Sequence, residues 1–557
     1  MNHKMYKALA VAVVLLVAKA SFGQENRLVL NPYDGSPGSM LMAQIKADTT
    51  ANHGIPSNRV YVLKRGGLYL CTEVFNVPNG STMNLRADYG AGKKPIIYLY
   101  PTGTGANPQR PPGNMFVLLG SNLIMRNIAV AGYFEPLDTN LNNVQGGLVN
   151  TTQPGSSIII DSCILTNING QHLRTGAASI KVEVTNSIFA NMGALSTSNL
   201  GAGKGLDLRE VSCDSLILKN NTFVNYQDRV VRHYNYSSPG SGTGALAVAI
   251  IDHNTFLNGM GFHGLLSLGS VGSKVMITNN LFMDAFACGE DTGDATRSAE
   301  WANTSEQYQN GNYRMSWIFT TPNDTTQWDI SNNYYGISDS GQAYLDDFNL
   351  TEDTPLSWHI NARVGIDSTT AFKKVWLKLA NTPRLMTNEM RWYRDPNGGN
   401  MTKNTPTSKW QWPSDDMDRR VYKYYEDTLN CSYNADQDLS KAGSDGKIIG
   451  ATNWTFMGVV AVNERPRELP SSFYLTQNYP NPFNPTTGIG YSVPKASHVT
   501  LEVYNVLGER VATLFSGVRQ PGNYVANFNG SKVASGVYFY RLQAGNVSIT
   551  KKLMLVK

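Results

Sequence analysis

The sequence has few charged residues and few cysteines, and it has no long apolar run after its first two dozen residues. Charged residues make up 16% of the 557 residues and the net charge is only +5, so composition alone indicates neither nucleic acid nor a membrane surface as a partner. The five cysteines are too few for a disulfide framework in a chain of this length, and their odd number leaves at least one unpaired. A hydrophobic fraction of 41% with 51 glycines suits a folded, β-rich chain of two or more domains.

The N-terminus carries the only strongly apolar run. Two lysines precede apolar residues 8–18, a stretch too short to cross a bilayer as a helix. Small residues follow, with cleavage expected after Ala20 or Gly23. This order is typical of a secretory signal peptide over residues 1–23, with a membrane anchor as the alternative.

From Ser472 the sequence becomes turn-rich and then alternates in short strands. The predicted strands cover residues 499–504, 509–515, 524–528, 537–542 and 548–556. Short strands at close spacing, separated by Gly and Asn, predict a small β-sandwich over residues 472–557.

Four segments of this region point to a family: QNYPNPFNPTT, YNVLGERV, ASGVYFYRL and the closing KKLMLVK. They resemble the type A C-terminal sorting domain of type IX secretion (Por) substrates. The resemblance implies export across the outer membrane of a Gram-negative cell, with the type IX machinery as a partner. It also implies frequent removal of the domain, with the cargo released or held at the cell surface. A generic binding sandwich is the alternative.

Between residues 120 and 340 one pattern recurs: an apolar alternation, an Asn or similar polar pair, and then a large apolar residue. The closing apolar residues are Val130, Leu165, Phe189, Phe223, Phe256, Phe282 and Tyr335. The period inside each unit is two, which predicts a solenoid of β-strands whose coils carry loops of varying length. Large apolar residues should stack inside, and asparagines should form ladders of amide hydrogen bonds. A second polar position supports this register: Asn167, Asn191, Asn225, Asn258 and Asp284.

This combination resembles the right-handed parallel β-helix proteins of the pectate-lyase-like superfamily, over residues 27–340. The expected organisation is all-β: a β-helix over 24–340, a tryptophan-rich helix and loop region over 341–465 that caps the solenoid, and the sandwich over 472–557. All nine tryptophans lie between Trp301 and Trp454, where packing or sugar stacking could use them. Residues 368–380 predict an amphipathic helix. The architecture hosts lyases, hydrolases, epimerases and adhesins alike, so it fixes no activity.

Basic residues follow the markers of successive coils and are expected to form a column on one sheet. They are His172, Arg174, Lys204, Arg229, Arg232, His233 and His263. Neighbours in such a column would be about 5 Å apart. Like charges at that spacing repel unless an anion neutralises them, and a row of uronate carboxylates is one candidate.

The chemistry that such a column suits is β-elimination of a uronate in an acidic polysaccharide. One cation neutralises the carboxylate and a base removes the neighbouring proton. We predict Arg232 and His263 as the catalytic pair, with His172, Arg174, Lys204, Arg229 and His233 binding substrate. Calcium is a further candidate, with weak ligands in Glu290, Asp291 and Asp294.

Two alternatives remain open. The arginines could instead pair with Asp207, Asp228 or Glu210 as a structural network, and the chain could then be a non-enzymatic glycan-binding or adhesin-like surface protein. A column open to solvent favours the lyase, and a column sealed by acidic partners favours the binding protein.

Overall fold

The computed structural model describes residues 25–102, 113–132, 146–168, 170–193, 201, 203–209, 211–233, 245–291, 293–302, 316–320, 323–352, 355–357, 360–361, 364–402, 429–433, 439–454, 472–475, 478 and 481–556. The predicted signal peptide lies outside these ranges. The chain divides into two compact units, Met1–Gly458 and Val459–Lys557. Each unit is described by itself.

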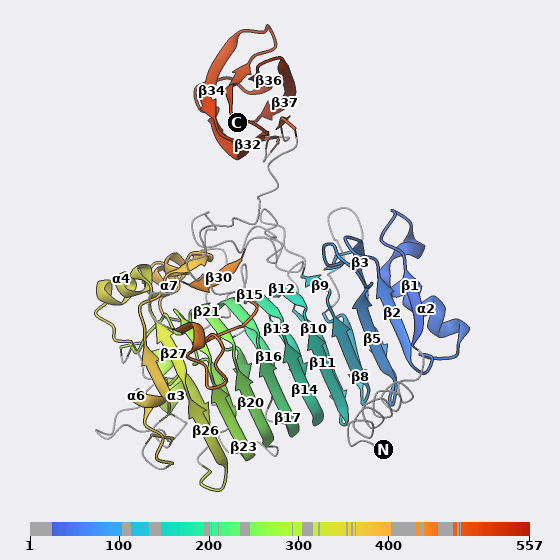
Figure 1. Ribbon diagram of the computed structural model, residues 1–557, viewed down its shortest axis with the longest axis vertical. Helices are drawn as coiled ribbons and strands as arrows, with labels where there is room; N and C mark the ends of the chain where they lie inside the picture. The colour runs from blue at the N-terminus through green and yellow to red at the C-terminus, as the bar shows by residue number, and fades with distance from the viewer. Residues whose placement is uncertain are drawn as a thin grey trace, which may run out of the picture. The chain divides into compact units, whose positions relative to one another are not determined.

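The first unit is a parallel β-helix of three long sheets (Figure 1). Each coil passes through sheet 1, sheet 2 and sheet 3 in turn. Sheet 1 contains β1 (Asn26–Leu30), β2 (Arg59–Leu63), β5 (Thr82–Ala87), β8 (Asn122–Arg126), β11 (Ser156–Asp161), β14 (Ser179–Thr185), β17 (Cys213–Lys219), β20 (Leu246–Asp252), β23 (Val271–Thr278) and β26 (Gln327–Ser331). Sheet 2 contains β3 (Leu68–Cys71), β6 (Ile96–Leu99), β9 (Ala129–Ala131), β12 (Ile164–Ile168), β15 (Ile188–Met192), β18 (Thr222–Tyr226), β21 (Thr255–Gly259), β24 (Leu281–Met283), β27 (Asn333–Gly336) and β28 (Phe372–Lys374). Sheet 3 contains β4 (Phe75–Val77), β7 (Phe116–Leu119), β10 (Gly147–Gln153), β13 (Gln171–Thr175), β16 (Lys204–Asp207), β19 (Val231–Arg232), β22 (Leu266–Gly269) and β25 (Ile318–Thr320).

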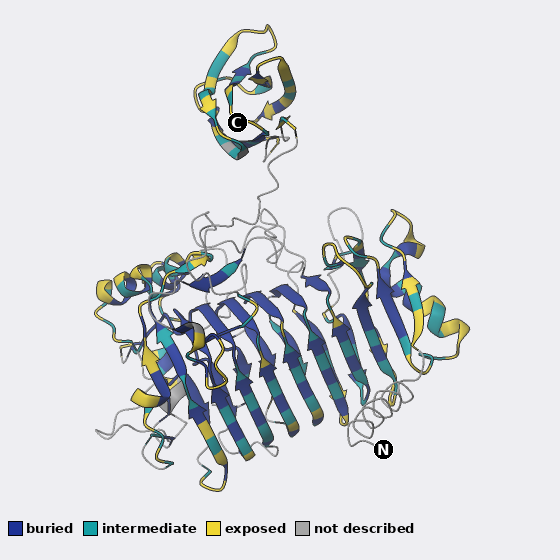
Figure 2. Ribbon diagram, viewed as in Figure 1, coloured by how far each residue is buried: buried dark blue, intermediate teal, exposed yellow. Residues whose placement is uncertain are grey.

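The interior of the solenoid is a continuous apolar core (Figure 2). Phe189, Phe223, Phe256 and Phe282 lie one above another, with ring centroids 5.2, 5.3 and 4.7 Å apart. The predicted stack of marker residues is thus confirmed. It forms because the side chains of a strand alternate between its two faces, so the same position of each coil points inward.

Two asparagine ladders run along the stack, as predicted. In the turn between sheets 1 and 2, each buried amide donates to the next coil over 2.9–3.0 Å, through Asn221, Asn254, Asn280 and Asn333. In sheet 2 a second ladder joins Asn167, Asn191, Asn225 and Asn258 over 2.8–3.3 Å. The residues of this second ladder have φ between 54° and 61°, a left-handed conformation that asparagine tolerates well.

The two ends of the solenoid are closed differently. At the N-terminal end, α2 (Leu41–Ala51) buries Leu41, Met42 and Ile45 in the solenoid core. At the other end the predicted helix over 368–380 is wrong: α6 (Ser368–Ala371) makes one turn before β28 pairs with β27. Phe372 of β28 enters the core, so pairing of an open sheet edge outweighs local helix preference here.

The region after residue 341 also lies along the outer face of sheet 2. The antiparallel pair β29 (Leu379–Asn381) and β30 (Asn430–Tyr433) shares an apolar cluster with outward residues of sheet 2, including Val224, Leu257 and Leu281. The chain at 439–454 runs back over earlier coils, where the Trp454 indole donates to Thr222 Oγ1 over 2.7 Å. This region therefore covers a face of the solenoid as well as its end.

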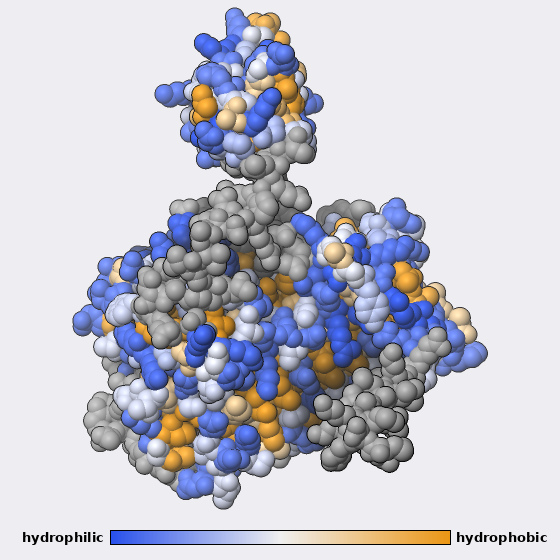
Figure 3. All heavy atoms as spheres, viewed as in Figure 1, coloured by the Kyte–Doolittle hydropathy of each residue, from blue (hydrophilic) through white to orange (hydrophobic). Residues whose placement is uncertain are grey.

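Three longer helices lie near the C-terminal coils: α3 (Ala295–Ala302), α4 (Asp339–Asp347) and α7 (Thr387–Arg394). Among the residues that the structure describes, no helix is long and apolar enough to cross a membrane. The outer face of sheet 1 carries a row of half-buried apolar residues, visible as orange patches in Figure 3. The row consists of Ile124, Ile159, Ile217, Ile250 and Met276, interrupted by Glu183.

The second unit has two antiparallel sheets around one apolar core. One sheet contains β31 (Tyr474–Leu475), β32 (Thr486–Val493) and β35 (Gly522–Asn529). The other contains β34 (Arg510–Arg519), β33 (Ser497–Tyr504), β36 (Gly536–Ala544) and β37 (Val547–Leu555). The five predicted strands correspond to β33–β37. β32 was not predicted, and it begins where the turn-rich segment of prolines and asparagines ends.

Candidate functional site

The predicted basic column lies on sheet 3, but its members take different positions. Arg174, Asp207, Arg232 and Ser267 are register partners on β13, β16, β19 and β22. Lys204 pairs instead with Gln171 in a separate column. Acidic and basic side chains therefore alternate where a row of cations was expected.

His172 is not part of either column. It is fully buried inside the solenoid, with its ring 5.3 Å from that of Phe189. The next residue, Leu173, is also buried in the core, so two successive side chains point inward at the start of β13 and simple alternation fails there. This corrects the expected place of His172, and burial lowers the pKa of its imidazole to about 3.

Replacing His172 with leucine should stabilise the protein and reduce its sensitivity to acid. Neither ring nitrogen makes a hydrogen bond of normal geometry among the described residues, and only weaker contacts with the backbone of Lys204 and Leu165 offset its burial. Leucine should therefore raise the free energy of unfolding at pH 7 by about 1 kcal/mol. An unfolded histidine binds a proton below pH ~6.5. As the pH falls from there toward 3, only the unfolded state takes up that proton and stability is lost. At pH ~4.5 the advantage of leucine should grow by about 2 to 3 kcal/mol.

Urea unfolding at the two pH values, followed by tryptophan fluorescence, measures this effect, because all nine tryptophans lie in the first unit. The control is His53→Asn, an exposed histidine of the first unit whose left-handed backbone asparagine also tolerates, which should leave both values nearly unchanged. Equal pH dependence of the wild-type and His172→Leu proteins would contradict the prediction.

Asp228 binds three of the predicted site residues. Its Oδ1 lies 2.7 Å from His263 Nδ1, and its Oδ2 lies 2.9 Å from Lys204 Nζ and 3.2 Å from Arg229 Nε. All four side chains are at least 95% buried. Burial alone would raise the pKa of the Asp228 carboxyl, but the charges of Arg229, Lys204 and His263 hold it well below its usual range.

Arg232 and His233 also have partners within the protein. Arg232 Nη1 donates to both oxygens of the buried Asp207 over 3.2 and 3.4 Å. The His233 ring lies within hydrogen-bonding distance of the carbonyl oxygens of Leu268 and Val211. These contacts favour the structural network that the sequence left open.

Two of the three acidic candidates for calcium have side-chain partners within the protein, and the third is placed by its backbone. Asp291 pairs with Arg394, and Asp294 accepts from the Tyr393 hydroxyl over 2.7 Å. Glu290 forms an isolated antiparallel bridge with Thr351. Within the described ranges, no group of three or more His, Cys, Asp or Glu side chains is arranged to hold a metal ion.

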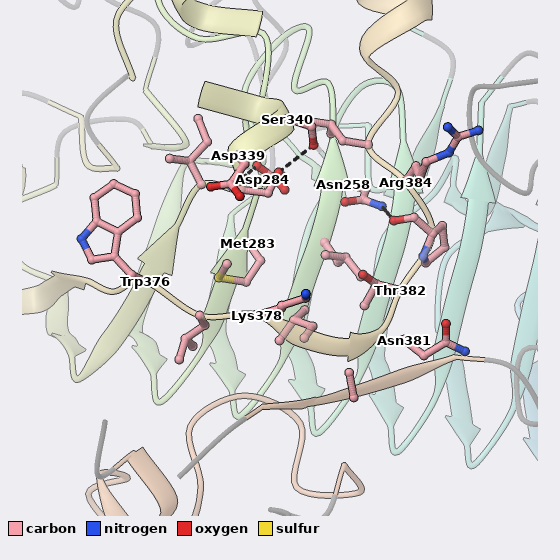
Figure 4. Close-up of a pocket in the computed structure, with 18 residues that line it drawn as sticks. Asn258, Met283, Asp284, Asp339, Ser340, Trp376, Lys378, Asn381, Thr382 and Arg384 are labelled. Carbon is pink, nitrogen blue, oxygen red and sulfur yellow. Dashed lines mark hydrogen bonds between the residues drawn. The ribbon is translucent and has the colours of Figure 1, made fainter. Parts of the chain in front are cut away.

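A groove of about 670 Å³ lies elsewhere, on the outer side of sheet 2 (Figure 4). Its floor comes from β21 and β24, and its walls come from the crossing segment 376–385 and the start of α4. Trp376 stands at its margin with 64% of its surface exposed. Polar groups face the same space: Asn258, Asp284, Ser338, Asp339, Ser340, Lys378, Asn381, Thr382 and Arg384.

The local sequence explains why Trp376 and Lys378 lie on the solvent side of the crossing segment, at the margin of the groove. Residues 375–379 alternate as Val-Trp-Leu-Lys-Leu, and Val375, Leu377 and Leu379 pack into the apolar cluster on sheet 2. The two intervening side chains therefore point away from that cluster. This period of two was a usable signal, although the surrounding residues favoured a helix.

Among the acids that line the groove, Asp284 has the most strongly shifted pKa. Its Oδ1 accepts the Ser338 backbone N–H over 2.9 Å. Burial, opposed by the Ser338 hydrogen bonds and supported by the charge of Glu352, raises the pKa of Asp284 to about 6. A buried acid with a raised pKa in a groove is a typical functional-site feature.

Comparison with known proteins identifies the second unit. The family model described as the secretion system C-terminal sorting domain matches residues 477–557. No curated protein matches the chain. The C-terminal unit is therefore a type IX secretion sorting domain, which indicates that the protein is exported through the outer membrane to the cell surface or the medium.

Proposed function

We propose that this exported β-helix binds a polysaccharide chain in the groove on sheet 2, as a secreted or surface-attached glycan-binding protein. The observation that carries the proposal is Trp376, a large aromatic side chain that is 64% exposed beside a 670 Å³ groove. An aromatic face offers an apolar platform for the C–H face of a sugar ring. Amide, hydroxyl and charged groups around it supply the donors and acceptors that sugar hydroxyls require.

The platform is held in place by its neighbours. The Val375 backbone N–H donates to the Tyr335 carbonyl oxygen over 2.8 Å, and the Lys374 ammonium lies 5.4 Å from the centre of the Trp376 ring. Lys374 is itself tied to Glu352 over 2.5 Å. A ring that is positioned before binding loses little freedom when a ligand stacks on it.

Trp376→Ala should weaken polysaccharide binding by about tenfold, equivalent to ~1.4 kcal/mol. Binding of the purified protein to a panel of neutral and acidic polysaccharides, measured by calorimetry, tests this. Tyr89→Ala is the matched control, because Tyr89 is 67% exposed on the first coils and lines no part of the groove. Absence of binding to every polysaccharide, or equal loss in both variants, would overturn the proposal.

A second candidate is the β-elimination of an acidic glycan at the basic column. Arg174 favours it, because this half-buried cation has no ion-pair partner among the described residues. The same panel separates the two functions: a lyase generates the ultraviolet absorbance of an unsaturated uronate, and Arg232→Ala or His263→Ala abolishes it. Binding without that absorbance leaves the groove as the functional site.

A further inference from the structure

Asp284 occupies a position where the repeat places asparagine. The four preceding coils carry Asn167, Asn191, Asn225 and Asn258 there, and Asp284 shares their left-handed backbone, with φ of 49°. The amides of Asn191, Asn225 and Asn258 each donate to the asparagine of the preceding coil. A carboxylate only accepts, so aspartate cannot continue the donation.

The ladder stops at this point. Asn258 Nδ2 donates to Asn225 Oδ1 and to the Pro383 carbonyl oxygen, and within the described residues no hydrogen bond joins Asn258 to Asp284. The carboxyl of Asp284 is instead held beside the start of α4. A Cβ at Gly341 would lie 2.4 Å from Asp284 Oδ1, so this glycine makes room for the carboxyl. Asp284 thus departs from the asparagine pattern beside a groove, and Gly341 accommodates the change. Such a departure from a repeat is characteristic of a functional residue.

Charged and titratable side chains surround Asp284 on several sides. Glu352 adds negative charge, and Tyr226 of β18 has its own pKa raised by burial and by Asp284. Asp339 of α4, and Lys378 and Arg384 of the crossing segment, line the groove. Since the pKa of Asp284 is raised to about 6, its carboxyl is ionised at neutral pH and mostly neutral near pH 5.

We propose that Asp284 is the residue through which this groove selects neutral glycans over glycans that carry uronates, a specificity that rests on the proposed glycan binding. The ionised carboxyl accepts hydrogen bonds from sugar hydroxyls. It repels a uronate carboxylate, because like charges in a partly buried groove are weakly screened. The neutral carboxyl retains hydrogen bonding and loses the repulsion.

The test uses two pairs of probes that differ mainly in the carboxylate: methyl-esterified and free polygalacturonate, and mannan and polymannuronate. The affinity of the full chain for each is measured at pH 7.5 and pH 5.0, where the uronates themselves stay ionised. The wild-type protein should prefer the neutral member of the bound pair by about tenfold at pH 7.5, and by less than about threefold at pH 5.0. Asp284→Asn should show no preference at either pH.

Asparagine is the residue that the ladder carries at this position, so Asp284→Asn should fold normally. Its urea midpoint above pH 6 should equal or exceed that of the wild type, because ionising a buried acid in the folded state costs stability. Asp339→Asn, a neighbouring exposed acid of the same groove, is the control and should keep the preference.

The outcomes separate the two proposals. If the wild type binds both members of a pair equally at pH 7.5, or if Asp339→Asn and not Asp284→Asn removes the preference, the role of Asp284 is overturned while groove binding stands. If no probe binds and Trp376→Ala changes nothing, both proposals fail together.

Discussion

Replacing Asp228 with asparagine is expected to lower the free energy of unfolding of the β-helix unit by about 3 to 5 kcal/mol. The substitution keeps the shape of the side chain and removes its charge. Lys204, Arg229 and His263 would then stay buried around a neutral amide, and a buried charge without its counter-ion is among the most costly features of a folded protein. Equilibrium urea unfolding, followed by tryptophan fluorescence, measures the loss.

Two variants make this result specific to the network. Asp214→Asn, on the exposed face of β17, should change the free energy of unfolding by less than about 0.5 kcal/mol. Adding Lys204→Met to Asp228→Asn should recover part of the stability, because one of the uncompensated cations is removed. A loss below about 1 kcal/mol for Asp228→Asn would show that the cations do not depend on this carboxylate, and would strengthen the β-elimination hypothesis.

Replacing Asn254 with leucine should cost a similar amount, about 3 to 5 kcal/mol, through the ladder in the turn between sheets 1 and 2. The Asn254 amide donates to the Leu218 carbonyl oxygen over 2.9 Å and to Asn280 Oδ1 over 3.0 Å. Its oxygen accepts from both the backbone and the side chain of Asn221 over 3.0 Å. Leucine has nearly the same volume but leaves these buried groups without partners.

The matched control is Asn76→Leu on β4, an exposed asparagine in the same unit, which should change stability by less than about 0.5 kcal/mol. Both proteins are compared with the wild type by urea unfolding. Equal, small losses in the two variants would mean that the ladder follows from the packing of the coils and contributes little to their stability.

The coils themselves could be predicted from the sequence, because they depend on local features. Alternation of apolar side chains specifies which residues enter a solenoid, and Phe189, Phe223, Phe256 and Phe282 stack as this pattern requires. Asparagine at a fixed offset marks the left-handed positions and the ladders, from Asn167 to Asn258. The sorting domain could be predicted equally well from the sequence, because its motifs are contiguous in the chain.

The candidate sites were harder to predict, because they depend on which residues of distant coils meet. The neighbours of Asp228 were uncertain since the loops between coils vary in length. Strict alternation would put His172 on the same outer face as Arg174, but both His172 and Leu173 are buried. The groove brings Asp284 of one coil beside Trp376 and Lys378 of a later segment, which local preference assigns to a helix.

The sequence by itself therefore determined the export route, the solenoid and its ladders, because each depends on local periodicity or on a contiguous motif. Only the tertiary structure decided that the basic residues are neutralised by Asp207 and Asp228, and that a groove with an exposed tryptophan opens where the second ladder ends. The physical reason is that charge pairing and concave surfaces are set by contacts between coils, whose register depends on loop lengths that no local pattern specifies.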